Sequence, residues 1–203
     1  FRISTAHWDT ALSNGHLVYL IGNDDSHDVS DITDIATRFT MINADENEAE
    51  KILSSLENGN AVGVDFPIIY DETLEQKIKR LKKNLPHITQ VELKDDTLLV
   101  SASKPISKIR FIGQEGKELK TQKNIKTGSY VIQPEDNYVR CELKFKDGTT
   151  LYLNPITRHE NNEITKQRLD HINYPKTIIL WTVYLSIISF AAYRIIKRLR
   201  NRR

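Results

Sequence analysis

Residues 138–154 have the sequence YVRCELKFKDGTTLYLN, in which two alternating runs flank the pair Asp147-Gly148. A period of two is typical of strands that bury one face, and Asp-Gly between two such runs is a strong hairpin signal. The same period extends back to Ile88 and gives about six short strands separated by turn residues. We therefore predict a small all-β sandwich domain over residues 88–155.

Residues 1–70 have a different pattern, in which helical and buried-strand signals alternate. The expected order is a helix that begins at Thr5 and stops at Gly15, a strand at 16–23, a helix at 45–58 and a strand at 61–66. Such alternation favours an α/β domain with a parallel sheet or barrel. Residues 71–87 follow as a linker helix, whose Lys and Arg residues are most simply a solvated face.

An uncharged run of 17 residues, TIILWTVYLSIISFAAY, covers residues 177–193. At ~1.5 Å per residue it spans about 25 Å, and with Ile195 and Ile196 it predicts a transmembrane helix over residues 177–196. Five residues suit the membrane interfaces: Tyr174, Lys176, Trp181, Tyr193 and Arg194. The alternative for this run is the buried core helix of a soluble protein.

The end of the chain carries six basic residues and no acidic one from Arg194 onward. The positive-inside rule places the tail, residues 197–203, in the cytoplasm, and residues 1–175 on the other side of a plasma or inner membrane. Residues 156–176 are then a juxtamembrane stalk. An RNA-binding tail is the alternative, but the apolar run next to the tail argues against it. Without these six charges the chain has 23 basic and 27 acidic residues, so the rest of the chain gives no electrostatic reason to expect nucleic-acid binding.

The polar cluster NDDSHD, residues 23–28, follows the predicted strand at 16–23. Asp25 and His27 are two positions apart, so on an extended backbone their side chains point to the same side. A carboxylate and an imidazole form half of a site for Zn, Mn or Fe, and Asp24 and Asp28 are candidates to orient these ligands from a second shell. A polar loop without metal is the alternative interpretation.

The run HWDTALSNGHLVYLIGNDDSHD, residues 7–28, resembles the last metal motif of the PHP (polymerase and histidinol phosphatase) superfamily of phosphoesterases. In that family a helix containing Trp-Asp leads through Leu-Ser-x-Gly into a strand that ends in Gly-x-x-Asp-x-His. The resemblance implies that residues 1–70 close a distorted β/α barrel. It also implies that Asp25 and His27 bind within a cluster of two or three metal ions, and that phosphate esters are the substrates.

The other metal ligands of that family are expected upstream of Phe1, and no catalytic residue is assigned within this chain. Three hypotheses therefore stay open. The chain is the C-terminal part of a membrane-anchored, metal-dependent phosphoesterase, or it is a non-enzymatic, membrane-anchored β-sandwich binding or scaffold protein with a degenerate PHP remnant. The third is a regulator of a soluble enzyme, or a nucleic-acid partner, that uses the basic tail.

Overall fold

The computed structural model describes residues 4–158 and 174–201. Residues up to 158 belong to one compact unit, and the second unit contains the C-terminal helix. Each unit is described by itself. Most of the stalk expected at 156–176 lies outside the described residues, and its first two residues belong to the last strand.

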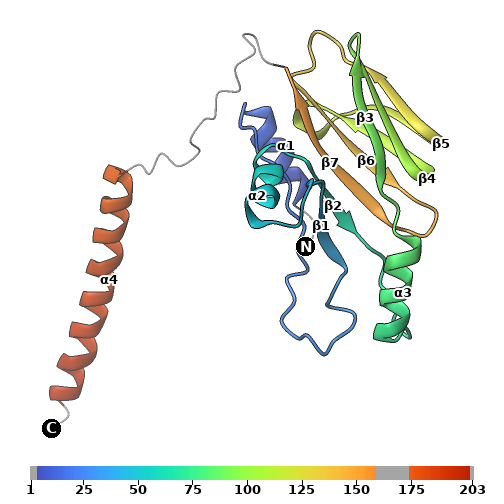
Figure 1. Cartoon of the computed structure of the whole chain (residues 1–203). Coiled ribbons are helices and arrows are strands. Elements are labelled where there is room, and N and C mark those ends of the chain that lie inside the picture. The colour runs from blue at the N-terminus through green and yellow to red at the C-terminus, as the bar shows by residue number, and fades with distance from the viewer. Residues whose placement is uncertain (1–3, 159–173, 202–203) are drawn as a thin grey trace. The chain divides into compact units, whose positions relative to one another are not determined.

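The first unit is built on a single seven-stranded sheet in which all paired strands are antiparallel (Figure 1). The order is β1-β2-β7-β6-β4-β3, and β5 pairs with β4. The strands are β1 (Arg38–Ile42), β2 (Ala61–Asp65), β3 (Ile88–Lys94), β4 (Thr97–Ile112), β5 (Glu118–Val131), β6 (Tyr138–Lys144) and β7 (Thr150–Thr157). The parallel sheet predicted for residues 1–70 is therefore wrong.

The hairpin predicted around Asp147-Gly148 is confirmed. β6 and β7 pair from Lys144 opposite Thr150 onward, and Gly148 has a φ of 92° that favours glycine. The Asp147 carboxylate accepts a hydrogen bond from the Thr149 backbone N–H at 3.0 Å, which closes the turn. The local turn chemistry therefore explains this part of the sheet.

The long strand β4 combines two strands that the sequence predicted separately. Its first part, 97–102, pairs with β3, and its last part, 108–112, pairs with β6, while β5 pairs with both parts. The pairing with β5 is irregular between Ser101 and Ile106. The strands predicted at 88–155 are thus present, but they are part of one larger sheet and do not form a separate sandwich.

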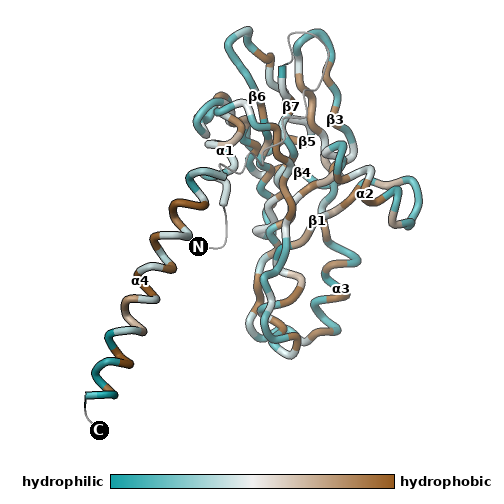
Figure 2. The backbone as a smooth tube through the Cα atoms, turned by 90° about the vertical axis from the view of Figure 1, so that its left-hand side faces the viewer, coloured by the Kyte–Doolittle hydropathy of each residue, from teal (hydrophilic) through white to brown (hydrophobic). Residues whose placement is uncertain are grey.

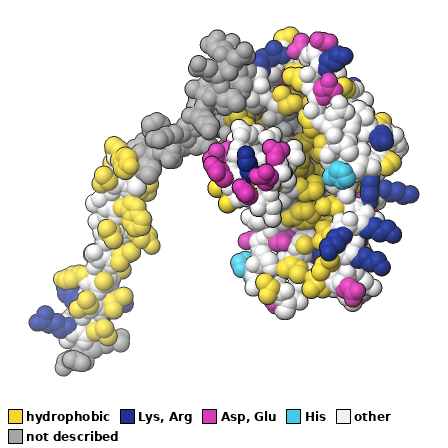
Figure 3. Space-filling view, in the orientation of Figure 1, with side chains coloured by type: hydrophobic (Ala, Val, Ile, Leu, Met, Phe, Trp, Pro, Cys, Tyr) yellow, Lys and Arg dark blue, Asp and Glu magenta, His cyan; other side chains and the backbone are white. Residues whose placement is uncertain are grey.

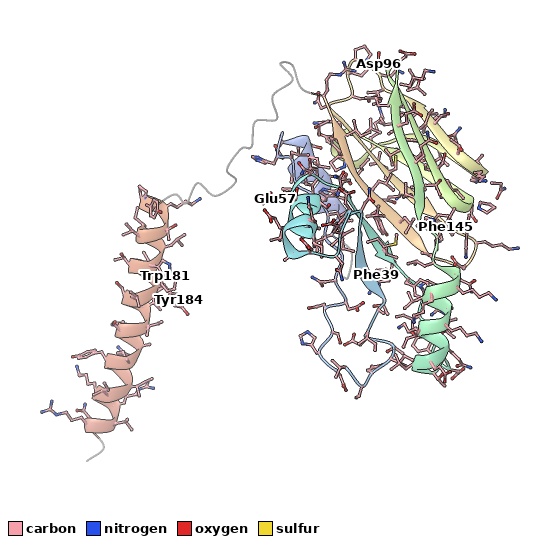
Figure 4. The ribbon with its side chains drawn as sticks, in the orientation of Figure 1. Phe39, Glu57, Asp96, Phe145, Trp181 and Tyr184 are labelled. Carbon is pink, nitrogen blue, oxygen red and sulfur yellow. The ribbon has the colours of Figure 1, made fainter. Side chains whose placement is uncertain are left out.

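One hydrophobic core joins the two predicted domains. Val64 of β2 and Phe66, which follows it, are buried in the same cluster as side chains of β4, β5, β6 and β7. Figure 4 shows Phe145, which follows β6 and belongs to this core, and Phe39 of β1, which packs against it. β2 pairs directly with β7, so residues 71–87 do not separate two domains in space.

The predicted strand at 16–23 is extended but forms no regular strand. Side chains replace the ladder: Thr40 hydrogen-bonds both the N–H and the C=O of Gly22 at 2.9 Å, and the Asn154 amide oxygen accepts from the Leu20 N–H at 2.8 Å. These side chains, from β1 and β7, satisfy partly buried backbone groups of the segment without backbone ladder pairing.

Three helices accompany the sheet. They are α1 (Thr5–Ser13), α2 (Ala49–Glu57) and α3 (Leu74–Asn84). Trp8 and Leu12 of α1 pack on Tyr138 of β6. α3 begins at a capping box formed by Thr73 and Gln76, and its Leu81 side chain packs on the main core, so the predicted linker helix is an integral part of the fold.

The second unit contains α4 (Tyr174–Arg200), a helix of 27 residues that is long and apolar enough to cross a membrane. Figure 2 shows hydrophobic residues along its middle and hydrophilic ones at its C-terminal end. Trp181 and Tyr184 pack edge to face, with ring centroids 6.1 Å apart (Figure 4). Near the other end the Arg194 guanidinium lies 5.9 Å from the Phe190 ring. The other predicted interface residues, Tyr174, Lys176 and Tyr193, are also on α4.

Candidate functional site

The candidate metal loop, residues 23–37, connects the extended segment to β1 and lies below β1 in Figure 1. Asp25 and His27 stand at its surface with side chains 89% and 87% exposed, and the Asp25 Oδ1 and His27 Nε2 atoms are 3.8 Å apart. Asp25 has a φ of 53°, the left-handed conformation that Asp tolerates better than most residues. The structure therefore brings the two predicted ligands together on an exposed surface.

Asp24 has a structural task that the sequence did not reveal. Its carboxylate accepts hydrogen bonds from the backbone N–H groups of Ala36, Thr37 and Arg38 at 2.5, 2.6 and 2.6 Å. Burial raises the pKa of Asp24, but these hydrogen bonds outweigh burial and hold the pKa below its ordinary value. Asp24 thus closes the loop across its base, and the predicted contact with His27 is not among its hydrogen bonds.

Asp28 and Asp31 form two local turns. The Asp28 carboxylate accepts from the N–H and hydroxyl of Ser30, and the Asp31 carboxylate accepts from the N–H and hydroxyl of Thr33. The hydrogen bonds, led in each case by the hydroxyl, lower the pKa of both carboxyls. Asp28 therefore shapes the loop backbone through Ser30, and its hydrogen bonds do not include one to His27. Its role in orienting a metal ligand stays a prediction.

Lys77 of α3 holds the same loop from inside. Its side chain is buried, and the ammonium donates to the backbone C=O groups of Ile32 and Ile35 at 2.6 and 2.5 Å. Burial, followed by the positive charge of Arg80, lowers the pKa of Lys77. Lys77 is therefore not part of a solvated face, and a lysine inside a basic run gave no sequence signal for this role.

Two ligands are available for a metal at this loop. A separation of 3.8 Å between a carboxylate oxygen and an imidazole nitrogen is less than twice a typical metal–ligand distance of ~2.0–2.2 Å, so both atoms can bind one ion. Among the residues that the structure describes, no group of three or more His, Cys, Asp or Glu side chains could hold a metal. Within the part of the chain that the structure describes, the loop therefore offers a candidate pair of ligands and no larger group.

A buried ionic network forms a second polar centre. The Arg140 guanidinium donates to both oxygens of Asp9, at 2.6 and 2.7 Å, and to Glu142 at 2.7 Å, and Arg110 also pairs with Glu142. The Tyr138 hydroxyl donates to Asp9 at 3.0 Å. This network joins α1 to β6. Asp9, of the Trp8-Asp9 pair in residues 7–28, therefore has a structural role. In the sequence it appeared only as a charged residue next to an apolar helix position.

The groove beside β3 and the buried Cys141 carry little reactive chemistry. An open groove of about 890 Å³ between β3 and the β2–β7 region is lined by His87 and by no Asp, Glu, Lys, Arg or Cys. The His87 imidazole therefore has no carboxylate or thiol partner in this lining with which to form a catalytic pair. Cys141 is fully buried, and burial raises the pKa of its thiol, so it is not a ready nucleophile.

Comparison of the chain with models of protein families, with curated proteins and with solved structures finds no match.

Proposed function

We propose that this chain is part of a membrane-anchored, metal-dependent phosphoesterase, in which Asp25 and His27 supply two of the metal ligands. The observation that carries the proposal is the pre-organised loop. Asp24 and Lys77 fix its backbone from two sides, and its tip presents a carboxylate and an imidazole 3.8 Å apart to solvent. A buried ammonium group is costly to desolvate unless it is hydrogen-bonded, so the two bonds from Lys77 to loop carbonyls hold the loop in one conformation.

The residues of this chain would act by binding and positioning. Asp25 and His27 bind the ion through oxygen and nitrogen, the donors that Zn and Mn accept. Asp24 keeps the Asp25 backbone in place through its bonds to 36–38. A bound divalent ion supplies a water of lowered pKa and neutralises charge on phosphoryl oxygens. The remaining ligands are expected from the upstream part of a complete PHP-like site.

The test compares the intact membrane-bound protein with Asp25→Asn and His27→Ala. Asn tolerates the φ of 53° at position 25, so the first variant removes charge with little strain. The expected result is loss of bound zinc or manganese, measured by elemental analysis, together with loss of p-nitrophenyl phosphate and bis-p-nitrophenyl phosphate hydrolysis.

Asp95→Asn and His87→Ala are matched controls, because both residues are exposed and lie outside the loop. They should leave metal content and hydrolysis unchanged. If the loop variants also retain wild-type metal content, the ligand assignment fails.

A non-enzymatic, membrane-anchored binding or scaffold protein is the second candidate. It is favoured because no group of three or more His, Cys, Asp or Glu side chains among residues 4–158 and 174–201 could hold a metal. Under this alternative the intact protein binds no stoichiometric metal, and the loop variants change neither metal content nor hydrolysis.

For its location we propose a single-pass membrane protein with a cytoplasmic C-terminus, supported by the apolar α4 and the basic residues at its end. Proteolysis of intact cells and of inverted vesicles tests the orientation. Digestion of residues 4–158 from the cytoplasmic side would contradict it.

A further inference from the structure

The turn before α3 and one side of α3 expose several large apolar side chains next to lysines. The exposed fractions are 48% for Ile69, 79% for Tyr70, 51% for Leu74 and 42% for Ile78. Three lysines that are also exposed follow on the helix. We call this surface the α3 face, and it consists of Ile69, Tyr70, Leu74, Ile78, Lys79, Lys82 and Lys83.

The spacing on α3 places this face at the edge of the core side. Leu74, Ile78 and Lys82 follow one another at intervals of four and share a stripe, and Lys79 and Lys83 lie on the adjacent stripe. On its other flank this stripe borders the buried Lys77 and the core residue Leu81, which follow Leu74 and Ile78 by three positions. Leu74 and Ile78 thus form an apolar edge that the fold leaves about half exposed, and positive charge borders it.

The α3 face is held rigid by contacts on the core side. Arg80 donates to both carboxylate oxygens of Glu72 at 2.7 and 2.6 Å and to the Pro67 carbonyl at 3.0 Å. Its guanidinium also stacks 4.1 Å from the centroid of the Phe66 ring. Glu72 is therefore neutralised, and Asp71 and Glu75 are the acidic residues that remain beside the face.

The charge of this region is opposite to that of the rest of the chain. α3 contains five basic residues and one acidic residue, whereas the chain without its C-terminal tail is net acidic. Figure 3 shows Lys and Arg side chains gathered over α3 and the neighbouring strand ends, and Asp and Glu side chains gathered over α2. An anionic partner would therefore be attracted to the α3 face and repelled by α2.

We propose that the α3 face is a second membrane-contact surface, which lies in the headgroup region of an anionic bilayer. α4 is long and apolar enough to cross a membrane, and when it does so the first unit is tethered to a bilayer. Tyr with aliphatic side chains and lysines is the composition of interfacial helices, because the apolar groups enter the boundary and the ammonium groups stay with lipid phosphates. This role is independent of metal binding at Asp25 and His27.

The experiment uses the full chain in lipid nanodiscs with a fluorophore at one introduced cysteine. Cys141 is buried and stays unlabelled in the native state. Tyr70→Cys reports the α3 face, and Glu57→Cys on α2 is the matched reference position. Spin-labelled lipids then measure contact with the bilayer as quenching.

In nanodiscs that contain phosphatidylglycerol we expect strong quenching at position 70 and weak quenching at position 57. The quenching at 70 should fall in phosphatidylcholine alone and in high salt, because the attraction is electrostatic. The triple change Lys79→Glu, Lys82→Glu and Lys83→Glu should abolish it. The same change of charge at Lys117, just before β5, and at Lys123 and Lys126 on β5 is the control and should preserve it.

Three results would overturn the proposal. One is equal quenching at positions 70 and 57 in all lipids. Another is quenching at 70 that survives the α3 charge reversal. The third is a fluorophore at 70 that is shielded from water but not quenched by any spin-labelled lipid, because a protein partner would then cover the face.

Discussion

The Asp9 carboxylate and the Arg140 guanidinium form a two-point buried ion pair that joins residues 131 positions apart in the chain. Both side chains are almost inaccessible, and the guanidinium also lies 4.9 Å from the centroid of the Trp8 ring. Burial opposes the charge of Arg140, but its hydrogen bonds to Asp9 and Glu142 outweigh burial and raise its pKa. Since α1 touches β6 through this pair and a small apolar cluster, the pair fixes where α1 docks.

We expect Asp9→Ala to destabilise the first unit by about 3–5 kcal/mol, because it leaves one side of a buried guanidinium without its partner. The double change Asp9→Leu with Arg140→Met should cost less than Asp9→Ala alone, since no unpaired charge remains. Urea unfolding followed by circular dichroism measures both. Lys144→Ala, at an exposed end of β6, is the control and should stay within about 0.5 kcal/mol of wild type. Equal losses for the single and double variants would contradict the ionic explanation.

Asp24 makes the base of the candidate metal loop sensitive to acid. Its pKa is below the ordinary value in the folded state, so its contribution is complete above the unfolded pKa of ~3.9 and is lost as pH falls through the lower folded value. We expect amide exchange at Ala36, Thr37 and Arg38 to accelerate below about pH 4, beyond its intrinsic pH dependence.

Asp24→Asn should remove this acid-induced step in amide exchange, because an amide does not titrate, and should make the loop more open at neutral pH. Asp95→Asn, in an exposed turn, should leave the step in place. The proposal for Asp24 fails if the step persists in Asp24→Asn.

The predicted strands of the β-rich part were correct in part: two of them are merged in β4, and most of β5 (Glu118–Val131) was missed. The correct ones have local signals. Alternation and turn residues such as Asp147-Gly148 depend on neighbours in sequence. The pairing of β2 with β7 joins residues 62–65 to 150–153. Neither the alternation of apolar and polar residues nor an apolar run identifies which strand will be the partner. The sequence therefore did not predict that β1 and β2 of the N-terminal segment join the sheet in antiparallel orientation.

The sequence predicted the exposed residues of the candidate site but not the contacts that hold its loop in place. Asp25 and His27 were found from their spacing, but Asp24 was assigned to the wrong partner because its three N–H donors come from 12 to 14 residues further on. Lys77 contacts carbonyl groups 42 and 45 residues away, and carbonyl groups carry no sequence signature. Such backbone contacts become visible only once the chain is folded.

Lys77→Met tests how far α3 supports the loop. The loss of two charge-assisted hydrogen bonds is offset by removal of a buried charge, so we expect global stability to change by only about 1 kcal/mol. Residues 28–37 should nevertheless lose protection from amide exchange, because the C=O groups of Ile32 and Ile35 lose their donor. Lys83→Met, exposed on the same helix, is the control for charge and should not change loop exchange.

The close approach of Gly22 to β1 gives a steric test of the extended segment. A Cβ at position 22 would lie 2.7 Å from the Phe39 backbone oxygen, and one at position 63 would lie 2.5 Å from the end of the Leu20 side chain. A backbone oxygen within a strand cannot move away without breaking pairing, whereas a leucine can change rotamer. We expect Gly22→Ala to cost about 1–3 kcal/mol and Gly63→Ala to cost less, as measured by urea unfolding. If the two substitutions are equally tolerated, the segment at 16–23 is not held against β1 by its hydrogen bonds to Thr40.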